Sequence, residues 1–402
     1  MNPYPVILIA PDSFKGSLSS GEAAAAIARG ARRVLPHASL RCHLLADGGE
    51  GTARALAELS GAVRVLTETC DPLSRPVTAE WFLSQEKRTA FIDTAAASGL
   101  TLLSPAERDA ALTSTYGTGQ LIAAAVDRGA KHIILGLGGS ATMDFGYGAL
   151  QALGAGFSDE NGDFLINHIS GSDLGRIRKI HTPQEMRRRL DGIRITCACD
   201  VLTPPCGALG AVAVFGPQKG LNPDEIVIFQ KYFSAQAALL TAICGEDIAT
   251  LPRGGAAGGI GATLHALLGA TLADGARLVI GSEEFSRSLA EASLVITGEG
   301  SADRQTLLGK GPGALMLAAR EKGIPTIILA GKVSDRDSLL DAGFAEAVCI
   351  NDSPTDRKTP LNTVFSGISP LPEQMCADVA SRRLEAAAAL ALSRFFRIHS
   401  RK

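Results

Sequence analysis

A carboxylate, a hydroxyl and an ammonium lie within four positions near the start of the chain, in Asp12, Ser13 and Lys15. They follow the apolar run Val6 to Ala10, which predicts a buried strand. A rigid strand end positions polar side chains better than a mobile loop does. These residues are therefore candidates to bind a ligand. Simple roles stay open: Asp12 and Ser13 would cap a turn, and Lys15 would be a solvated surface lysine.

Two further groups of carboxylates are embedded in glycine-rich sequence. Asp47 and Glu50 belong to the stretch ADGGEGT, and Glu299 and Asp303 belong to TGEGSAD, which also contains Gly298. Each stretch follows a predicted strand. A tight strand-to-helix turn explains the glycines, but it does not explain the paired carboxylates beside them. In an open parallel sheet, ligands bind beyond the carboxyl ends of the strands, so we expect these groups to lie at a binding edge.

A third glycine-rich stretch, GLGGSATMD, carries hydroxyls, and its single carboxylate is its last residue. It contains Gly138, Gly139, Ser140 and Thr142 after an apolar run. Backbone amides exposed by glycines, with hydroxyls at a helix start, form an anion-binding nest. Gln218 and Lys219 in FGPQKG add an amide and a cation. Asp200 follows another predicted strand and is either a turn residue or a carboxylate that acts as base or metal ligand.

Several common catalytic motifs are missing from the sequence. It has no G-x-S-x-G elbow, no G-x-x-x-x-G-K-[ST] phosphate loop and no strand-borne G-x-G-x-x-G that opens a helix. No two of the seven histidines have a metal-binding spacing, and the eight cysteines form no C-x-x-C pair. Glycine nests, carboxylates and a few lysines remain. This combination indicates phosphoryl transfer assisted by Mg²⁺, in which positioning and charge provide the catalysis.

The composition excludes other classes of function. The 39 Lys and Arg residues against 41 Asp and Glu residues give a net charge of −2, which favours neither nucleic acid nor an anionic membrane as partner. No apolar run approaches the roughly 20 residues of a membrane span, and no segment resembles a signal peptide. We expect a soluble cytoplasmic protein. The number of chains that assemble is left open, with a homodimer as one candidate.

The predicted elements form one doubly wound domain that is split in the sequence. Strands are expected at Val6 to Ala10 and near Leu40 to Ala46, with helices after Ser19 and from about Thr52 to Ser60. The same alternation returns with strands at 294–297, 326–330 and 347–350 and a closing helix over about 373–396. Residues 1–64 and 286–402 are therefore expected to form one parallel sheet in the order 2-1-3-4-5.

Residues 65–285 are expected to form a second α/β domain inserted into the first. Strands at Thr78 to Leu83 and Thr89 to Asp93 follow one another without an intervening helix. Further strands are predicted at 132–137, 194–199 and 210–214, and a long helix after Asn222. The predicted fold class is thus α/β, with a doubly wound parallel sheet and an inserted domain.

The ordered motifs resemble those of the bacterial glycerate kinases. The resemblance spans nearly the whole chain and is carried by PDSFKGS, ADGGEGT, AAASGL, GTG, GLGGSAT, CDV, VFGPQKG, GGAAGGIGA, ITGEGSADRQT and GKGP. It implies ATP, Mg²⁺ and D-glycerate as ligands, 2-phosphoglycerate as product, and a flavodoxin-like domain into which a second α/β domain is inserted. Met143 stands where the family pattern leads us to expect asparagine, and TPPCG at 203–207 departs from Asn-Pro-Leu-x-Gly.

On this resemblance, the site is expected in the cleft between the two domains. Lys15 is expected to neutralise charge on an oxygen of the substrates, and Asp47 or Asp200 to receive the hydroxyl proton. The remaining candidates divide into glycerate-binding residues (Asp12, Ser13, Glu50, Gln218 and Lys219), phosphate- or nucleotide-binding residues (Gly138, Gly139, Ser140, Thr142 and Gly298) and metal ligands (Asp303 and Glu299).

Two alternatives remain at this point. GLGGSAT is also similar to the phosphate loop of galactokinase-like small-molecule kinases, although those lack PDSFK and ADGGEGT. A nucleotide-sensing protein would keep the glycine-rich anion nests but would not catalyse a reaction. Formation of ADP with D-glycerate separates the latter from a kinase.

Overall fold

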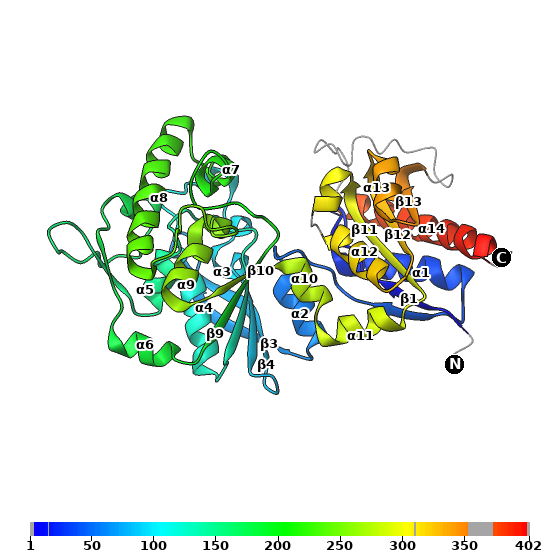
Figure 1. The fold of residues 1–402 in the computed structure, drawn as a ribbon, viewed down its shortest axis with the longest axis horizontal. Coiled ribbons are helices and arrows are strands. Elements are labelled where there is room, and N and C mark those ends of the chain that lie inside the picture. Colours follow the sequence, from blue (N-terminus) through cyan, green and yellow to red (C-terminus); the bar gives the residue numbers. More distant parts are fainter. Residues whose placement is uncertain (1–3, 15, 309–310, 353–372, 400–402) are drawn as a thin grey trace. The chain divides into compact units, whose positions relative to one another are not determined.

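The computed structural model describes residues 4–14, 16–308, 311–352 and 373–399, and the chain divides into two compact units (Figure 1). Unit 1 comprises residues 1–46 and 276–402, and unit 2 comprises residues 47–275. The second unit is therefore inserted into the sequence of the first, in keeping with the predicted fold class. The boundaries fall at 46/47 and 275/276, whereas the sequence placed them at 64/65 and 285/286.

Unit 1 contains a five-stranded parallel sheet in the order β13-β12-β11-β1-β2. Its strands are β1 (Val6–Ile9), β2 (Ser39–Cys42), β11 (Leu294–Ala302), β12 (Thr326–Val333) and β13 (Glu346–Cys349). Numbered within this sheet, the order is 2-1-3-4-5, so the predicted order is confirmed. It arises because β1 pairs with both β2 and β11.

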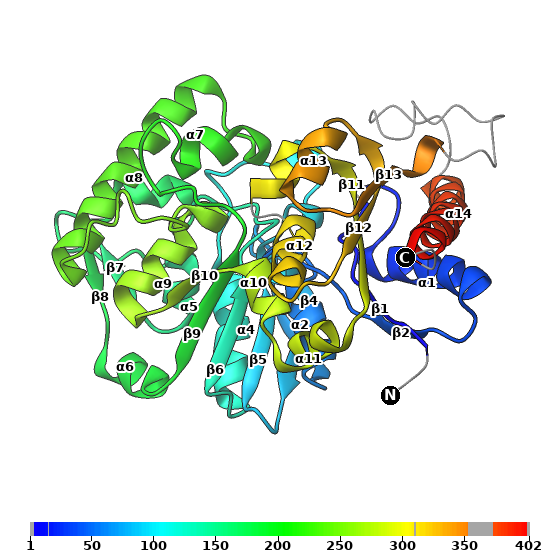
Figure 2. The same cartoon turned by 45° about the vertical axis from the view of Figure 1, so that its right-hand side comes forward.

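Helices cover both faces of the unit 1 sheet, which explains its apolar strands (Figure 2). In β12, Ile327 and Leu329 belong to the core with α1 (Ser20–Val34) and α14 (Glu373–His399). Ile328 and Ala330 face the opposite way, toward α12 (Gly311–Glu321) and α13 (Arg336–Ala342). A strand that is buried on both faces has no polar alternation. The helices α10 (Gly275–Ile280) and α11 (Glu283–Glu291) precede β11.

Unit 2 contains a six-stranded mixed sheet in the order β10-β9-β6-β5-β4-β3. Four of its strands are parallel: β5 (Thr89–Asp93), β6 (His132–Gly136), β9 (Arg194–Cys199) and β10 (Thr271–Asp274). The strands β3 (Val63–Cys70) and β4 (Pro76–Ser84) extend the sheet in antiparallel pairing. A small hairpin joins β7 (Gly156–Ser158) and β8 (Lys179–His181).

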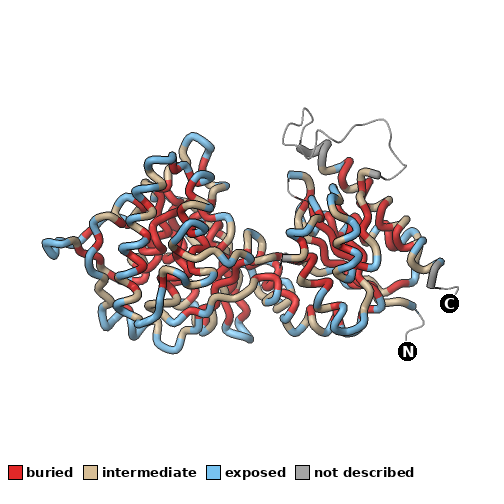
Figure 3. The backbone as a smooth tube through the Cα atoms, turned by 45° about the horizontal axis from the view of Figure 1, so that its top comes forward, coloured by how far each residue is buried: buried red, intermediate tan, exposed pale blue. Residues whose placement is uncertain are grey.

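Eight helices of unit 2 surround a core that includes the buried Trp81, Tyr147 and Phe233. They are α2 (Thr52–Leu59), α3 (Ala95–Ser98), α4 (Tyr116–Asp127), α5 (Tyr147–Ala152), α6 (Gln184–Leu190), α7 (Ala211–Phe215), α8 (Pro223–Cys244) and α9 (Ile260–Leu268). Buried residues concentrate in the interior of each unit (Figure 3). Each unit therefore has a core of its own.

Helix α8 bears on the expectation that no segment spans a membrane. Within the described residues it is the one helix long and apolar enough to do so, judged by length and composition alone. Its buried residues, which include Phe229, Phe233 and Leu240, belong to the core of unit 2. Core packing therefore accounts for the apolar composition of its inner face.

One predicted strand is wrong, and one correctly predicted helix lies in the other unit from the one expected. Residues 210–214 were expected as a strand, but Ala211–Phe215 form the helix α7. The short apolar run is compatible with either structure by pattern alone. The helix predicted at 52–60 exists as α2, but it packs against β4, β5 and β6 and thus belongs to unit 2. The ADGGEGT motif that precedes α2 therefore also belongs to unit 2, from Asp47 onward.

Candidate active site

The four parallel strands of unit 2 end together at one edge of the sheet. Asp93 at the end of β5 is in register with Gly136 of β6, and Asp274 of β10 is in register with Cys199 of β9. The β6 and β9 strands are also paired up to Gly136. Loops that follow these strands therefore gather at the carboxyl edge, where open α/β sheets bind ligands.

The ADGGEGT loop packs directly against this edge, backbone to backbone. A Cβ atom on Gly138 would lie 2.4 Å from the Cα of Gly49, and one on Gly48 would lie 2.5 Å from the Cα of Cys199. The amide of Gly138 also donates to the carbonyl of Gly48 at 3.1 Å. Side chains of any size are excluded at these contacts. Three motifs, ADGGEGT, GLGGSAT and CDV, thus meet at one place.

This packing brings several of the predicted site residues into one neighbourhood. Asp47 and Asp200 flank the contact between Gly48 and Cys199 in sequence, and the Asp47 Oδ1 accepts from the amide of Gly49 at 3.1 Å. Glu50 lies beside Gly139, because a Cβ on that glycine would be 3.9 Å from the Glu50 Oε2. Unit 2 therefore holds carboxylates and the glycine nest on the same sheet edge.

Asp93 anchors the ADGGEGT loop, and the sequence analysis did not single it out as a functional residue. Its Oδ2 accepts from the amide of Gly51 at 2.8 Å and its Oδ1 from that of Ala53 at 3.0 Å. Burial raises the pKa of Asp93 to about 7, and the two amides oppose this rise. The only available signal was a carboxylate at a strand end. Asp93 fixes the start of α2 and thereby the loop before it.

Lys219 lies beneath the GLGGSAT loop, with only 2% of its surface exposed. Its Nζ donates to the Oγ of Ser140 at 2.8 Å and to the carbonyl oxygen of Thr142 at 2.9 Å. Burial lowers the pKa of Lys219 to about 7, and the charge of Asp144 opposes this decrease. Gln218 lies exposed on the same short 3₁₀ turn, Pro217–Lys219.

Asp144 closes the GLGGSAT loop from inside the protein. The fully buried carboxylate accepts from the Thr115 amide and hydroxyl at 2.7 and 2.6 Å, and from the amides of Gly146 and Gly148 at 3.1 Å each. Burial raises its pKa. The neighbouring Met143 is fully buried in the hydrophobic core. The departure from asparagine therefore places an apolar side chain in the core.

Arg253 is a second residue that the sequence analysis did not single out. Its guanidinium donates to the carbonyl of Cys199 at 2.6 Å and pairs with Asp274 at 3.2 Å. The backbone of Arg253 has φ +69°, which is uncommon for a residue other than glycine and often accompanies functional sites. Its sequence signal was a single arginine before the GGAAGG glycines. It ties together the ends of β9 and β10 next to Asp200.

In unit 1, the ends of β1 and β11 carry the other predicted residues. The amide of Asp12 donates to the carbonyl of Gly298 at 2.8 Å, and the amide of Ser13 donates to the Asp12 Oδ1 at 2.6 Å. Asp12, Ser13 and Gly298 are therefore neighbours. Lys15 lies outside the described residues.

Glu299 and Asp303, the predicted metal ligands, are linked through one hydroxyl. The Thr306 Oγ1 donates to the Oε1 of the buried Glu299 at 2.6 Å and accepts from the amide of Asp303 at 3.1 Å. The Asp303 Oδ1 accepts from the amide of Gln305 at 2.7 Å. Within the described part of the chain, no group of three or more His, Cys, Asp or Glu residues is arranged to hold a metal ion.

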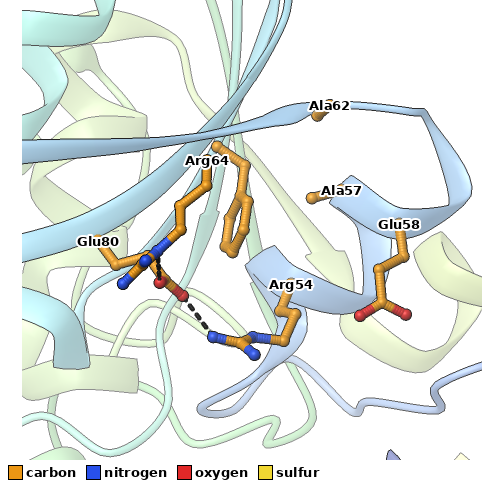
Figure 4. Close-up of a pocket in the computed structure, with 7 residues that line it drawn as sticks. Arg54, Ala57, Glu58, Ala62, Arg64 and Glu80 are labelled. Atoms are coloured by element: carbon orange, nitrogen blue, oxygen red, sulfur yellow. Dashed lines mark hydrogen bonds and ion pairs between the residues drawn. The ribbon is translucent and has the colours of Figure 1, made fainter.

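A surface pocket of about 350 Å³ lies elsewhere in unit 2, between α2, β3 and β4 (Figure 4). Glu80 there pairs with both Arg54 and Arg64, the former at 2.6 Å. The remaining lining residues are Ala57, Glu58, Ala62 and Phe82. None of the glycine motifs contributes a residue to it, and its arginines are already paired. The glycine-rich sheet edge is therefore the stronger candidate for chemistry.

Glycines, hydroxyls and carboxylates gathered at the carboxyl ends of parallel strands are the kind of groups that transfer of a phosphoryl group to a small molecule requires. The model of the glycerate kinase family matches residues 7–380 of this chain. The chain therefore belongs to the glycerate kinase family, as the sequence motifs predicted, and is a kinase.

Named relatives support this assignment over most of their length. The chain is 39% identical over 375 residues to a glycerate kinase of Bacillus subtilis (strain 168), covering 93% of this chain and 97% of the relative. It is 42% identical over 330 residues to the glycerate 2-kinase of Escherichia coli (strain K12), covering 82% and 86%.

A solved structure shows the same fold. The crystal structure of a "putative glycerate kinase 2" from Salmonella typhimurium LT2 matches with a TM-score of 0.82 and 37% identity. The match covers 99% of this chain and 100% of the other. The predicted α/β class is thereby confirmed.

Proposed function

We propose that this protein transfers the γ-phosphoryl group of ATP to D-glycerate and forms 2-phosphoglycerate and ADP. The observation that carries the proposal is the packing of ADGGEGT against GLGGSAT through Gly48, Gly49 and Gly138. This packing supports the proposal because it brings carboxylates beside the glycines of GLGGSAT, in a chain that belongs to the glycerate kinase family. Charge compensation and positioning are what phosphoryl transfer requires.

The GLGGSAT loop is proposed to bind the phosphates of ATP. Gly138 lets the backbone approach a ligand closely while its own amide donates to the carbonyl of Gly48. Gly139 offers a backbone amide, and Ser140 and Thr142 add hydroxyl donors. The buried Lys219 supports this assignment, because it places a positive charge beneath the loop. Gly298, which lies within β11, is proposed as a further nucleotide contact.

Carboxylates at the sheet edges are proposed to handle the acceptor. Asp47 or Asp200 accepts the proton of the glycerate 2-hydroxyl. The hydroxyl oxygen forms a bond to the γ-phosphorus while the bond between this phosphorus and the ADP oxygen breaks. Lys15 neutralises negative charge on the substrates. The groups proposed to bind and orient glycerate are Asp12, Ser13, Glu50 and Gln218, with Lys219 acting from beneath the loop.

Mg²⁺ is proposed to accompany ATP, with Glu299 and Asp303 as its protein contacts. Mg²⁺ commonly binds through one or two carboxylates together with substrate phosphates and water. The two carboxylates, linked through the Thr306 hydroxyl, support this assignment. The ion would neutralise charge on the transferring phosphates. Since ATP is supplied in the cytoplasm, the proposal also places the enzyme there.

The test is NMR analysis of the product formed from D-glycerate, ATP and Mg²⁺. A phosphorus–proton coupling to the C2 proton of glycerate, with one ADP per product, is expected. Coupling to the C3 protons would reject the proposed regiochemistry. ATP binding without ADP formation would favour a nucleotide sensor, and phosphorylation of a sugar in place of glycerate would favour a galactokinase-like enzyme.

A further inference from the structure

The ammonium of Lys219 is a buried cation without an anionic partner. In the described part of the chain it makes no ion pair, and its two hydrogen-bond acceptors, the Ser140 Oγ and the Thr142 carbonyl, are neutral. Asp144 acts on it only as a nearby charge. An isolated buried charge is unfavourable unless it is compensated. A site with this feature is suited to an anion that arrives with a ligand.

The hydrogen bond between Lys219 and Ser140 has a defined direction. A lysine ammonium only donates, so the Ser140 Oγ is the acceptor at 2.8 Å. The hydroxyl proton of Ser140 must then point away from Lys219. Among the described residues, no hydrogen bond gives this proton an acceptor, although only 4% of the residue is exposed. A donor is therefore left for an incoming acceptor.

A second hydroxyl of the same loop is also without a partner. The Thr142 Oγ1 is buried and makes no hydrogen bond in the described structure, while the carbonyl of Thr142 accepts from Lys219. A buried hydroxyl without a partner is unfavourable. Lys219 thus holds a loop segment in which two hydroxyl donors remain unused.

We propose that Lys219 is a positioning residue that orients the Ser140 hydroxyl toward a phosphate oxygen of the nucleotide. This inference rests on the proposed function and changes the role of Lys219 from direct glycerate binding to support from beneath the loop. Its burial argues for this role, because a side chain with 2% exposure acts through the residues above it. The charge of Lys219 also adds positive potential at the nest.

The test is a double-mutant cycle of Lys219→Met and Ser140→Ala, read as kcat/KM for ATP in the full-length protein. Each single variant should lower kcat/KM by about 10- to 100-fold, the usual range for a buried donor to a charged group. Because Lys219 acts through Ser140, the double variant should be little worse than Lys219→Met alone. The exposed Lys231 gives the matched control, and Lys231→Met should behave as wild type.

Two outcomes would overturn the inference in a wild-type enzyme that is active. One is a double variant whose loss equals the product of the two single losses, and the other is Lys219→Met with unchanged kcat and KM. A wild-type protein without turnover would instead reject the proposed function, and the inference with it.

A third variant separates positioning from a purely structural role. Lys219→Gln keeps a donor toward Ser140 without the charge and should retain several-fold more activity than Lys219→Met, at equal thermal stability. A loss of activity that follows the melting temperature across the variants would contradict the proposal. If Lys219→Met does not fold, the cycle is carried out with Lys219→Gln.

Discussion

The two sheet edges of this protein hold their charged groups in different ways. In unit 2, Asp93 and Asp144 are tied to backbone amides and Lys219 is buried under the glycine loop. In unit 1, Asp12 and Asp303 accept hydrogen bonds from amides one and two residues further along the chain, and both remain partly exposed.

The difference separates two tasks. A loop whose charges are already bound and whose glycines are in backbone contact is preorganised for an anion. Carboxylates that remain partly exposed can still gain a ligand. Asp303 in unit 1 is of this second kind, but so are Asp47 and Asp200 in unit 2, and the proposed Mg²⁺ contact Glu299 is buried. In the proposed function, unit 2 supplies the phosphate nest and the base, and unit 1 supplies Lys15 and the contacts to Mg²⁺.

The largest expected effect comes from removing one charge in each unit. Asp47→Asn in unit 2 and Lys15→Met in unit 1 should each lower kcat by on the order of 10²–10³, because groups that act on transition-state charge contribute this much. Steady-state kinetics with both substrates checks this, with the exposed Asp163→Asn as control. Near-normal turnover of either variant, with unchanged KM, would show that its motif is structural.

The next effect breaks the preorganisation of unit 2 alone. In Gly138→Ala, the new Cβ would lie 2.4 Å from the Cα of Gly49, so the two loops must separate. A displacement of about 1 Å can lower the rate about 10²-fold. Gly21→Ala in α1 is the matched control, since its Cβ meets only the Leu44 Cδ2 at 3.6 Å. Equal activity of the two variants would mean that the loop contact is dispensable.

The pH dependence should show stability and activity changing in opposite directions. Burial lowers the pKa of Lys219 to about 7, and the charge of Asp144 opposes this decrease. In the unfolded chain, the pKa of a lysine is about 10.4. Between these values the unfolded chain binds more protons, so the free energy of unfolding rises with pH. The charge under Ser140 is lost over the same range, so kcat/KM for ATP should fall above about pH 7.

Lys219→Met separates this titration from others. Urea unfolding and kinetics are measured from about pH 6 to pH 9. In the variant, residue 219 should contribute neither to the pH dependence of the free energy of unfolding nor to that of kcat/KM. The free energy of unfolding of the wild type should increase relative to that of the variant as the pH rises. A fall of kcat/KM above about pH 7 that persists unchanged in Lys219→Met would assign the titration to another group.

The smallest effect concerns the Thr142 hydroxyl, which is buried without a partner. Thr142→Val removes the unsatisfied group at nearly constant shape, so the free energy of unfolding should rise by about 1 kcal/mol. If the hydroxyl meets a phosphate, kcat/KM for ATP should fall about tenfold. Thr263→Val is the opposite control, because the Thr263 hydroxyl donates to the carbonyl of Phe145, and that variant should lose stability.

The sheet of unit 1 could be predicted because its strands are apolar on both faces. Ile327 and Leu329 pack on one side and Ile328 and Ala330 on the other, which leaves a continuous apolar run in the sequence. The unit boundary was less accessible. The helix α2 has the same local pattern in either unit, and only its packing against β4 and β5 assigns it to unit 2.

The glycine motifs could be identified in the sequence, but the residues that hold them could not. The Asp93 carboxylate anchors amides of Gly51 and Ala53, which lie about forty positions away in the chain. Arg253, which lies in a turn, donates to the carbonyl of Cys199 in β9, 54 positions away in the chain. Contacts of this kind depend on the tertiary fold and leave no local pattern.

The central claim, that the phosphates bind at the GLGGSAT loop of unit 2, can be tested by NMR of protein labelled with ¹⁵N-glycine. Titration with Mg²⁺ and a nonhydrolysable ATP analogue should shift the amide signals of Gly138 and Gly139 in Gly-assigned spectra. Half-saturation of these shifts should agree with that of ATP binding measured by calorimetry. Signals of Gly138 and Gly139 that stay in place while the analogue binds would contradict the account.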